Sequence, residues 1–140
     1  MGMVGAVVVA HGRLGEAMVQ VVEHMLGGRR GIESVSTSPD EPCEDIRARI
    51  AAAVRRVDGG AGVLIFTDML GDTQTNVSVE IARTTGAEVL AGVNMPILVK
   101  MMGARETMDV RSLAAFLRAY GQDHIFWPTE VRERPGSIAS

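Results

Sequence analysis

Two titratable side chains stand directly after apolar, strand-like runs. His11 follows the run at residues 4–10 and is itself followed by Gly12, and Asp68 follows the run at residues 62–67. If these strands are neighbours in a parallel sheet, their ends lie about 4.8 Å apart and the two side chains can meet. An Asp that accepts a hydrogen bond from one imidazole nitrogen leaves the other nitrogen as a nucleophile or base. The pair therefore predicts a site built on His11 and oriented by Asp68.

A glycine followed by polar residues leads from Asp68 into the next helix. Gly71, Asp72 and Thr73 stand at its expected start. Free backbone N–H groups and the helix dipole make such a start an anion site, so we expect these three residues to bind an anion. No G-K-[ST] follows Gly71, and no G-x-G-x-x-G follows any strand. Neither a Walker A loop nor a dinucleotide site is therefore predicted.

The same residues allow other interpretations. A His–Asp pair is two thirds of a hydrolase triad, but the sequence has no G-x-S-x-G elbow, and only Ser38 or Thr73 could replace the nucleophile. Asp68 could simply form a turn, and Thr73 could simply be an N-cap. His24 and His124 have no partner at metal-ligand spacing. We predict neither a metal site nor a cofactor.

The elements that must position these residues alternate between strand and helix. Strands are expected at residues 4–10, 32–37, 62–67 and 88–93. The buried face of the first helix is expected to consist of Leu14, Met18, Val21 and Met25. Right-handed crossovers place helices on both faces of a parallel sheet. We therefore predict an α/β fold with a mostly parallel, doubly wound sheet in the order 2-1-3-4.

The C-terminal part does not follow this alternation. Residues 125–127 are apolar and strand-like, lie after the last helix, and need a partner to bury them. The final residues have the composition of a loose tail. We expect a single domain over residues 1–130 and a loose tail over residues 131–140.

Composition limits the classes of function. The 140 residues suit one domain. The net charge of −3 argues against nucleic-acid binding. The single cysteine, Cys43, excludes an internal disulfide framework and fits a reducing compartment. No apolar stretch approaches the ~20 residues that cross a bilayer, and the start has no basic n-region. We expect a cytoplasmic protein that does not insert into membranes.

Three motifs together resemble one family. They are Val-Val-Val-Ala-His-Gly-Arg-Leu-Gly-Glu-Ala at residues 7–17, Phe-Thr-Asp-Met-Leu-Gly-Asp-Thr-Gln-Thr-Asn at residues 66–76, and Ala-Gly-Val-Asn-Met-Pro at residues 91–96. In this order and spacing the chain resembles, from about residue 3 to residue 127, the EIIA component of the mannose class of the bacterial phosphoenolpyruvate:sugar phosphotransferase system.

The resemblance implies a function and an assembly. It implies that His11 accepts a phosphoryl group from the phosphocarrier HPr and passes it to an EIIB partner for sugar uptake, so the chain would be a phosphotransferase component with a phosphohistidine intermediate. It implies that Asp68 orients the ring and that the helix start around Thr73 holds the phosphoryl oxygens. It also implies that an antiparallel strand at residues 125–127 is exchanged within a homodimer.

The chain departs from that family at one point. The family usually has Gly-Gly-Ser/Thr-Pro where this chain has Gly71-Asp72-Thr73-Gln74. A carboxylate at a helix N-terminus is favoured by the helix dipole, so we expect Asp72 to turn away from His11. The alternative to a carrier is a regulatory binding module on the same fold, with weak or no onward phosphotransfer.

Overall fold

The sheet is parallel and carries the two predicted site residues at neighbouring strand ends. The computed structural model describes residues 2–28 and 31–130. Its strands are β1 (Gly5–His11), β2 (Ile32–Thr37), β3 (Val63–Thr67) and β4 (Glu88–Ala91). They are ordered β2-β1-β3-β4, which confirms the predicted order 2-1-3-4. Val9 of β1 is in register with Thr67 of β3, so Asp68 follows directly beside the end of β1.

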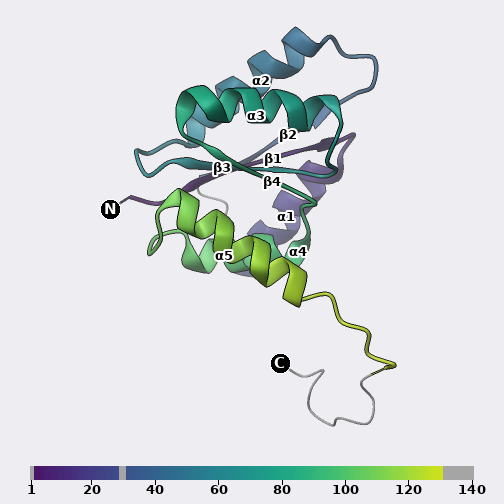
Figure 1. Cartoon of the computed structure of the whole chain (residues 1–140), viewed down its shortest axis with the longest axis vertical. Helices are drawn as coiled ribbons and strands as arrows, with labels where there is room; N and C mark the ends of the chain where they lie inside the picture. Colours follow the sequence, from purple (N-terminus) through teal and green to yellow (C-terminus); the bar gives the residue numbers. More distant parts are fainter. Residues whose placement is uncertain (1, 29–30, 131–140) are drawn as a thin grey trace.

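Helices cover both faces of the sheet. They are α1 (Leu14–Leu26), α2 (Cys43–Val57), α3 (Thr73–Thr85), α4 (Met95–Ala104) and α5 (Val110–Asp123). In Figure 1, α2 and α3 lie on one face, and α1, α4 and α5 lie on the other. Side chains cap two of these helices: Asn94 accepts the N–H of Ile97 at 3.0 Å at the start of α4, and Asp109 accepts that of Ser112 at 2.9 Å at the start of α5.

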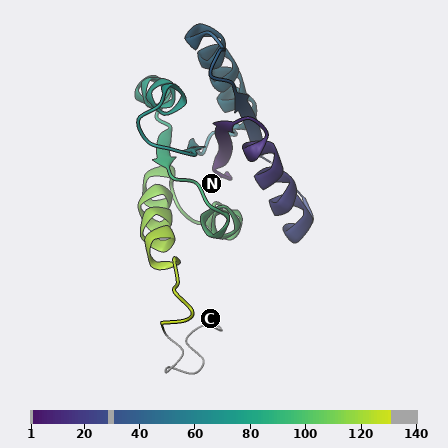
Figure 2. The ribbon, with the colours of Figure 1, turned by 90° about the vertical axis from the view of Figure 1, so that its right-hand side faces the viewer.

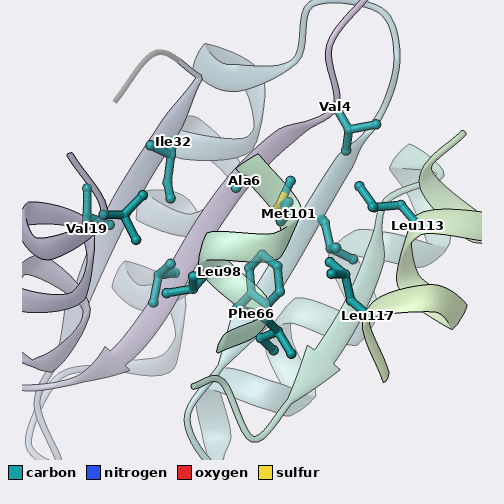
Figure 3. Packing of buried hydrophobic residues seen from close by; sticks show 13 residues of the cluster. Val4, Ala6, Val19, Ile32, Phe66, Leu98, Met101, Leu113 and Leu117 are labelled. Carbon is teal, nitrogen blue, oxygen red and sulfur yellow. The ribbon is translucent and has the colours of Figure 1, made fainter. Parts of the chain in front are cut away.

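The core forms one layer on each face of the sheet. On the side of α4 and α5, Phe66 is fully buried beside Leu98, Met101 and Leu117 (Figure 3). On the side of α2 and α3, the buried layer is Val7, Val9, Val35, Ile46, Ile50, Ala53, Val54, Val57, Val63, Ile65, Val77, Ile81 and Ala87. Burial on both faces explains why the central strands are continuous apolar runs rather than alternating ones.

The expected buried face of α1 was wrong for three of its four residues, and the fourth, Met18, is partly buried and packs against the core. The residues of α1 that are buried are Gly15, Val19 and Val22, whereas Leu14, Val21 and Met25 are exposed. The helix lies close to β1 at Gly15, where an added Cβ would come within 3.1 Å of the backbone oxygen of Val8. A glycine allows this close approach, and the approach rotates the larger apolar side chains toward solvent.

The C-terminal segment forms no strand within the described part of this single chain. After α5 the chain leaves the sheet and helices (Figure 1 and Figure 2). Ile125, Phe126 and Trp127 are 81%, 51% and 66% exposed. The exchanged strand therefore remains a prediction that needs a second chain. The tail expected at residues 131–140 lies outside the described residues.

None of the helices in the described ranges, 2–28 and 31–130, is long and apolar enough to cross a membrane.

Candidate functional site

His11 and Asp68 form the centre of the site. His11 is the last residue of β1, and Asp68 is the first residue after β3. The Oδ2 atom of Asp68 accepts the backbone N–H of His11 at 3.0 Å and lies 2.8 Å from Nδ1 of its ring. This confirms the predicted hydrogen bond. Two bonds to one residue fix both the position of the carboxylate and the orientation of the imidazole, and they direct Nε2 away from Asp68.

The electrostatics of the pair favour an imidazole held by a carboxylate. The hydrogen bond to Asp68 raises the pKa of His11 above its ordinary value, against a smaller opposing effect of burial, and the charges of Asp68 and Asp72 add to the increase. Burial would raise the pKa of Asp68, but hydrogen bonds from His11 and Gln74 together lower it. Asp68 is thus an anion at neutral pH, and it stabilises positive charge on the ring.

Gln74 is a site residue that the sequence analysis did not identify. Its side chain is buried, its Nε2 donates to Oδ1 of Asp68 at 2.7 Å, and the same atom lies 3.1 Å from Nδ1 of His11. Its Oε1 accepts from the Thr37 hydroxyl at 3.4 Å. With Gln74 in place, both oxygens of Asp68 are hydrogen-bonded. One signal in the sequence could have identified Gln74: it is a polar residue in the first turn of the helix that starts beside the predicted His11–Asp68 pair.

Turns at two glycines bring these elements together. Gly12 has φ +55° and Gly71 has φ +93°, a region that side-chain-bearing residues rarely adopt. Gly12 turns the chain out of β1 directly after His11, and Gly71 turns it into α3. The loop between β3 and α3 is held by the Thr75 hydroxyl, which lies 2.8 Å from Oγ1 of Thr67 and 2.6 Å from the backbone oxygen of Met69.

The start of α3 differs from both expectations made for it. The N-cap is Asp72, not Thr73: Oδ1 of Asp72 accepts the N–H of Thr75 at 3.2 Å. Asp72 also does not turn away from His11, because its Oδ2 lies 3.9 Å from Nε2 of the ring. The cap fixes the carboxylate over the strand ends, and that position leaves one oxygen facing the histidine.

A small pocket opens beside the ring. Its volume is about 90 Å³, and its lining is His11, Thr37, Ser38, Pro39, Glu41, Ile46, Asp72, Thr73 and Gln74. The first backbone N–H groups of α3 have no acceptor within the helix, which gives the Asp72–Thr73 end of the pocket donors for an anion. Gly71 belongs to the turn before the helix and is not part of this lining.

The same cluster offers atoms that a metal ion could bridge. Ligand atoms of His11, Asp68 and Asp72 lie within 4.8 Å of one another. Both oxygens of Asp68 already accept hydrogen bonds, so only Nε2 of His11 and Oδ2 of Asp72 are available. Structural zinc sites generally use four protein ligands and catalytic ones three, and two side-chain atoms fall short of either set. The absence of a metal site stays a prediction.

The sequence is similar to known sugar-uptake proteins. The family model described as "PTS system fructose IIA component" matches residues 5–117. The mannose-specific EIIAB component of Escherichia coli is 29% identical over 104 residues, which are 74% of this chain and 32% of that protein. This chain thus spans about a third of the length of that relative. The sorbose-specific EIIA component of Lacticaseibacillus casei is 26% identical over 112 residues, 79% of this chain and 80% of that protein.

Solved structures share the fold. A mannose/sorbose-specific IIA subunit from Enterococcus faecalis superimposes with a TM-score of 0.78 at 23% identity, covering 90% of this chain and 95% of that one. An EIIA component from Streptococcus agalactiae gives a TM-score of 0.82 at 21% identity, covering 91% and 99%. At these identities the likeness establishes the fold alone.

Proposed function

Because the chain belongs to the EIIA-man family of phosphotransferase-system IIA components, whose members are phosphocarriers, we propose that it accepts a phosphoryl group on Nε2 of His11 from phospho-HPr and passes it to an EIIB partner for sugar uptake. The observation that carries this proposal is the 2.8 Å hydrogen bond between Nδ1 of His11 and Asp68. It holds the proton on Nδ1 and leaves the Nε2 lone pair at the pocket.

Phosphoryl transfer uses the Nε2 atom of His11, the carboxylate of Asp68 and the start of α3. The Nε2 lone pair forms a bond to phosphorus while the bond between phosphorus and the donor group of phospho-HPr breaks and its electron pair returns to that donor group. The positive charge that develops on the His11 ring is stabilised by Asp68. The phosphoryl oxygens face the first N–H groups of α3, near Thr73. Transfer to EIIB follows by the same steps in the opposite direction, with His11 as the leaving group.

The arrangement supports a carrier rather than a small hydrolase. Ser38 and Thr73 line the pocket, but within the described residues no hydroxyl is hydrogen-bonded to the His11 ring, whose Nδ1 is hydrogen-bonded to Asp68. A hydrolase nucleophile is normally activated by such a bond. Nε2 itself is therefore the nucleophile in our proposal.

We also propose a homodimer. Three large apolar side chains that follow one another at residues 125–127 are more than half exposed, and such a segment is buried when it pairs with a second copy of the chain. The domain at residues 1–130 would then be the unit that dimerises.

The decisive experiment is phosphorylation by phosphoenolpyruvate, enzyme I and HPr, with detection of acid-labile phosphate. The intact chain should be labelled, and His11→Ala should not. The His11 side chain is 42% exposed, so its removal leaves no core cavity, and circular dichroism should show a retained fold.

His24→Ala is the matched control, because His24 is exposed on α1 and lies outside the site; it should be labelled like the intact chain. Labelling of His11→Ala would refute the assignment. Transfer of the label to a mannose-class EIIB domain then tests the carrier role, and a labelled chain that never transfers would favour the regulatory module instead.

A further inference from the structure

Asp72 places a fixed carboxylate oxygen next to the nitrogen that is to react. Its Oδ1 caps α3 through the N–H of Thr75. Its Oδ2 is buried, has no hydrogen-bond partner among the described residues, and lies 3.9 Å from Nε2 of His11. The cap holds the side chain, so the free oxygen is directed at the histidine rather than at solvent.

This placement favours the protonated imidazole. A buried anionic oxygen without a donor is unfavourable, and a proton on Nε2 of His11, 3.9 Å away, reduces this cost by placing a positive charge beside it. With that proton, the ring lies between two carboxylates, Asp68 at Nδ1 and Asp72 at Nε2. Without it, the Nε2 lone pair and the Asp72 oxygen face each other. The form of His11 that can attack phosphorus is therefore the form that Asp72 disfavours.

The incoming group meets the same carboxylate. A phosphoryl group is anionic and must approach Nε2 of His11, where the Asp72 charge repels it. The Asp72 side chain also occupies one N–H group of the α3 start, that of Thr75, which a phosphoryl oxygen could otherwise use.

We propose that Asp72 restrains phosphorylation of His11, so that this chain is a slow phosphoryl acceptor whose rate is set by the charge at position 72. The proposal rests on the phosphocarrier function proposed above and adds the residue that limits it.

Among the described residues, the charged groups that line the pocket or shift the pKa of His11 are Asp68, Asp72 and Glu41. An ion pair of Arg13 with Glu16 follows shortly after His11 in the sequence. Asp68 has both oxygens hydrogen-bonded, and Glu41 is neutralised by a bidentate contact with Arg49. Arg13 and Glu16 are exposed. Of these carboxylates, Asp72 is the one with an oxygen, Oδ2, that has no hydrogen-bond partner among the described residues.

Asp72→Asn tests the proposal, because Asn is an equally good N-cap and removes the negative charge. Initial rates of phosphorylation by purified phospho-HPr, in buffer with a chelator, should rise at least tenfold, which is ~1.4 kcal/mol of barrier. The pH profile should also move to lower pH, since the Asp72 charge helps to raise the pKa of His11 and attack requires the neutral ring. Asp72→Ser, a second neutral cap, should behave in the same way if Asp72→Asn folds poorly.

Two controls separate charge from structure. Asp109→Asn makes the same change at the cap of α5, away from the site, and should leave the rate unchanged. Asp72→Glu keeps the charge and should not accelerate the reaction. An unchanged or lower rate in Asp72→Asn and Asp72→Ser, or an equal rise in Asp72→Glu, would overturn the inference while leaving the phosphocarrier proposal intact. Absence of labelling in every variant, with HPr itself phosphorylated, would instead refute the phosphocarrier proposal.

Discussion

Replacing Asp68 by Asn or by Ala separates its charge from its hydrogen bonds. The carboxylate accepts three hydrogen bonds, from the backbone N–H of His11 at 3.0 Å, from Nδ1 of its ring at 2.8 Å and from Nε2 of Gln74 at 2.7 Å. Asn preserves the shape and one good acceptor. Ala removes every acceptor. The two variants should therefore differ in stability more than in phosphorylation.

The loss of stability follows from which donors are left without an acceptor. In Asp68→Ala, the His11 backbone N–H and the buried Gln74 amide lose their partner, and each such loss costs about 1–2 kcal/mol. The Nδ1 proton sits on a ring that is 42% exposed, so water can replace its partner. We expect the free energy of unfolding of Asp68→Ala to fall by about 2–4 kcal/mol, and that of Asp68→Asn by about 1 kcal/mol.

The effect on phosphorylation follows from charge. When Nε2 bonds to phosphorus, the His11 ring becomes cationic, and a hydrogen bond to a charged group contributes about 1.5–3 kcal/mol. The exposure of the ring screens this interaction toward the lower end of that range. A loss of about 1.5 kcal/mol slows transfer roughly tenfold, and both variants lose the same charge.

Urea unfolding followed by circular dichroism gives the stabilities, and initial rates with purified phospho-HPr give the kinetics. Asp109→Ala is the control for stability alone: it removes an N-cap, which costs about 1 kcal/mol, and should leave the rate unchanged. An Asp68→Asn protein that is phosphorylated at the rate of the intact chain would refute the role of the charge. An Asp68→Ala protein that loses less than about 0.5 kcal/mol would refute the hydrogen-bond account.

Two further predictions concern pH and assembly. The raised pKa of His11 stabilises the fold fully below its ordinary value of about 6.5 and is lost as pH rises through the raised value. The stability difference between the intact chain and His11→Ala, from urea unfolding, should therefore shrink as pH increases; a constant difference would contradict it. Truncation after His124, the C-cap of α5, removes residues 125–140, the apolar residues 125–127 among them, and should give monomer or insoluble protein by light scattering. A stable truncated dimer would refute exchange of that segment.

The pattern of residues along the chain was sufficient to predict the sheet and the pair at its centre. Apolar runs of strand length fixed β1 and β3 as buried central strands, and the residues directly after them, His11 and Asp68, had to meet once the two strands were neighbours. The caps of α4 and α5 are local features of the same kind, because an N-cap depends on one side chain and the N–H groups of the next turn.

The exact face of a helix depended on tertiary packing. The apolar residues of α1 are compatible with more than one buried face. The face that is buried contains Gly15, Val19 and Val22, because Gly15 lets the helix approach the backbone of β1 closely. The spacing of apolar residues gives a period, but it does not say how near two backbones come. Likewise, residues 125–127 are strand-like in composition, and a strand needs a partner that their own sequence does not supply.

The surroundings of His11 show most clearly which features follow from the sequence and which depend on tertiary packing. The residue types indicated that an acid stands at the start of α3, but the helix dipole alone gave no reason for its second oxygen to face the ring. The start of α3 lies over the ends of β1 and β3. This position directs Oδ2 of Asp72 toward the His11 ring and brings the Gln74 amide to Asp68. The order of residues along the chain places these groups at the carboxyl edge of the sheet, and the packing of α3 against that edge determines which of their atoms face the reacting nitrogen.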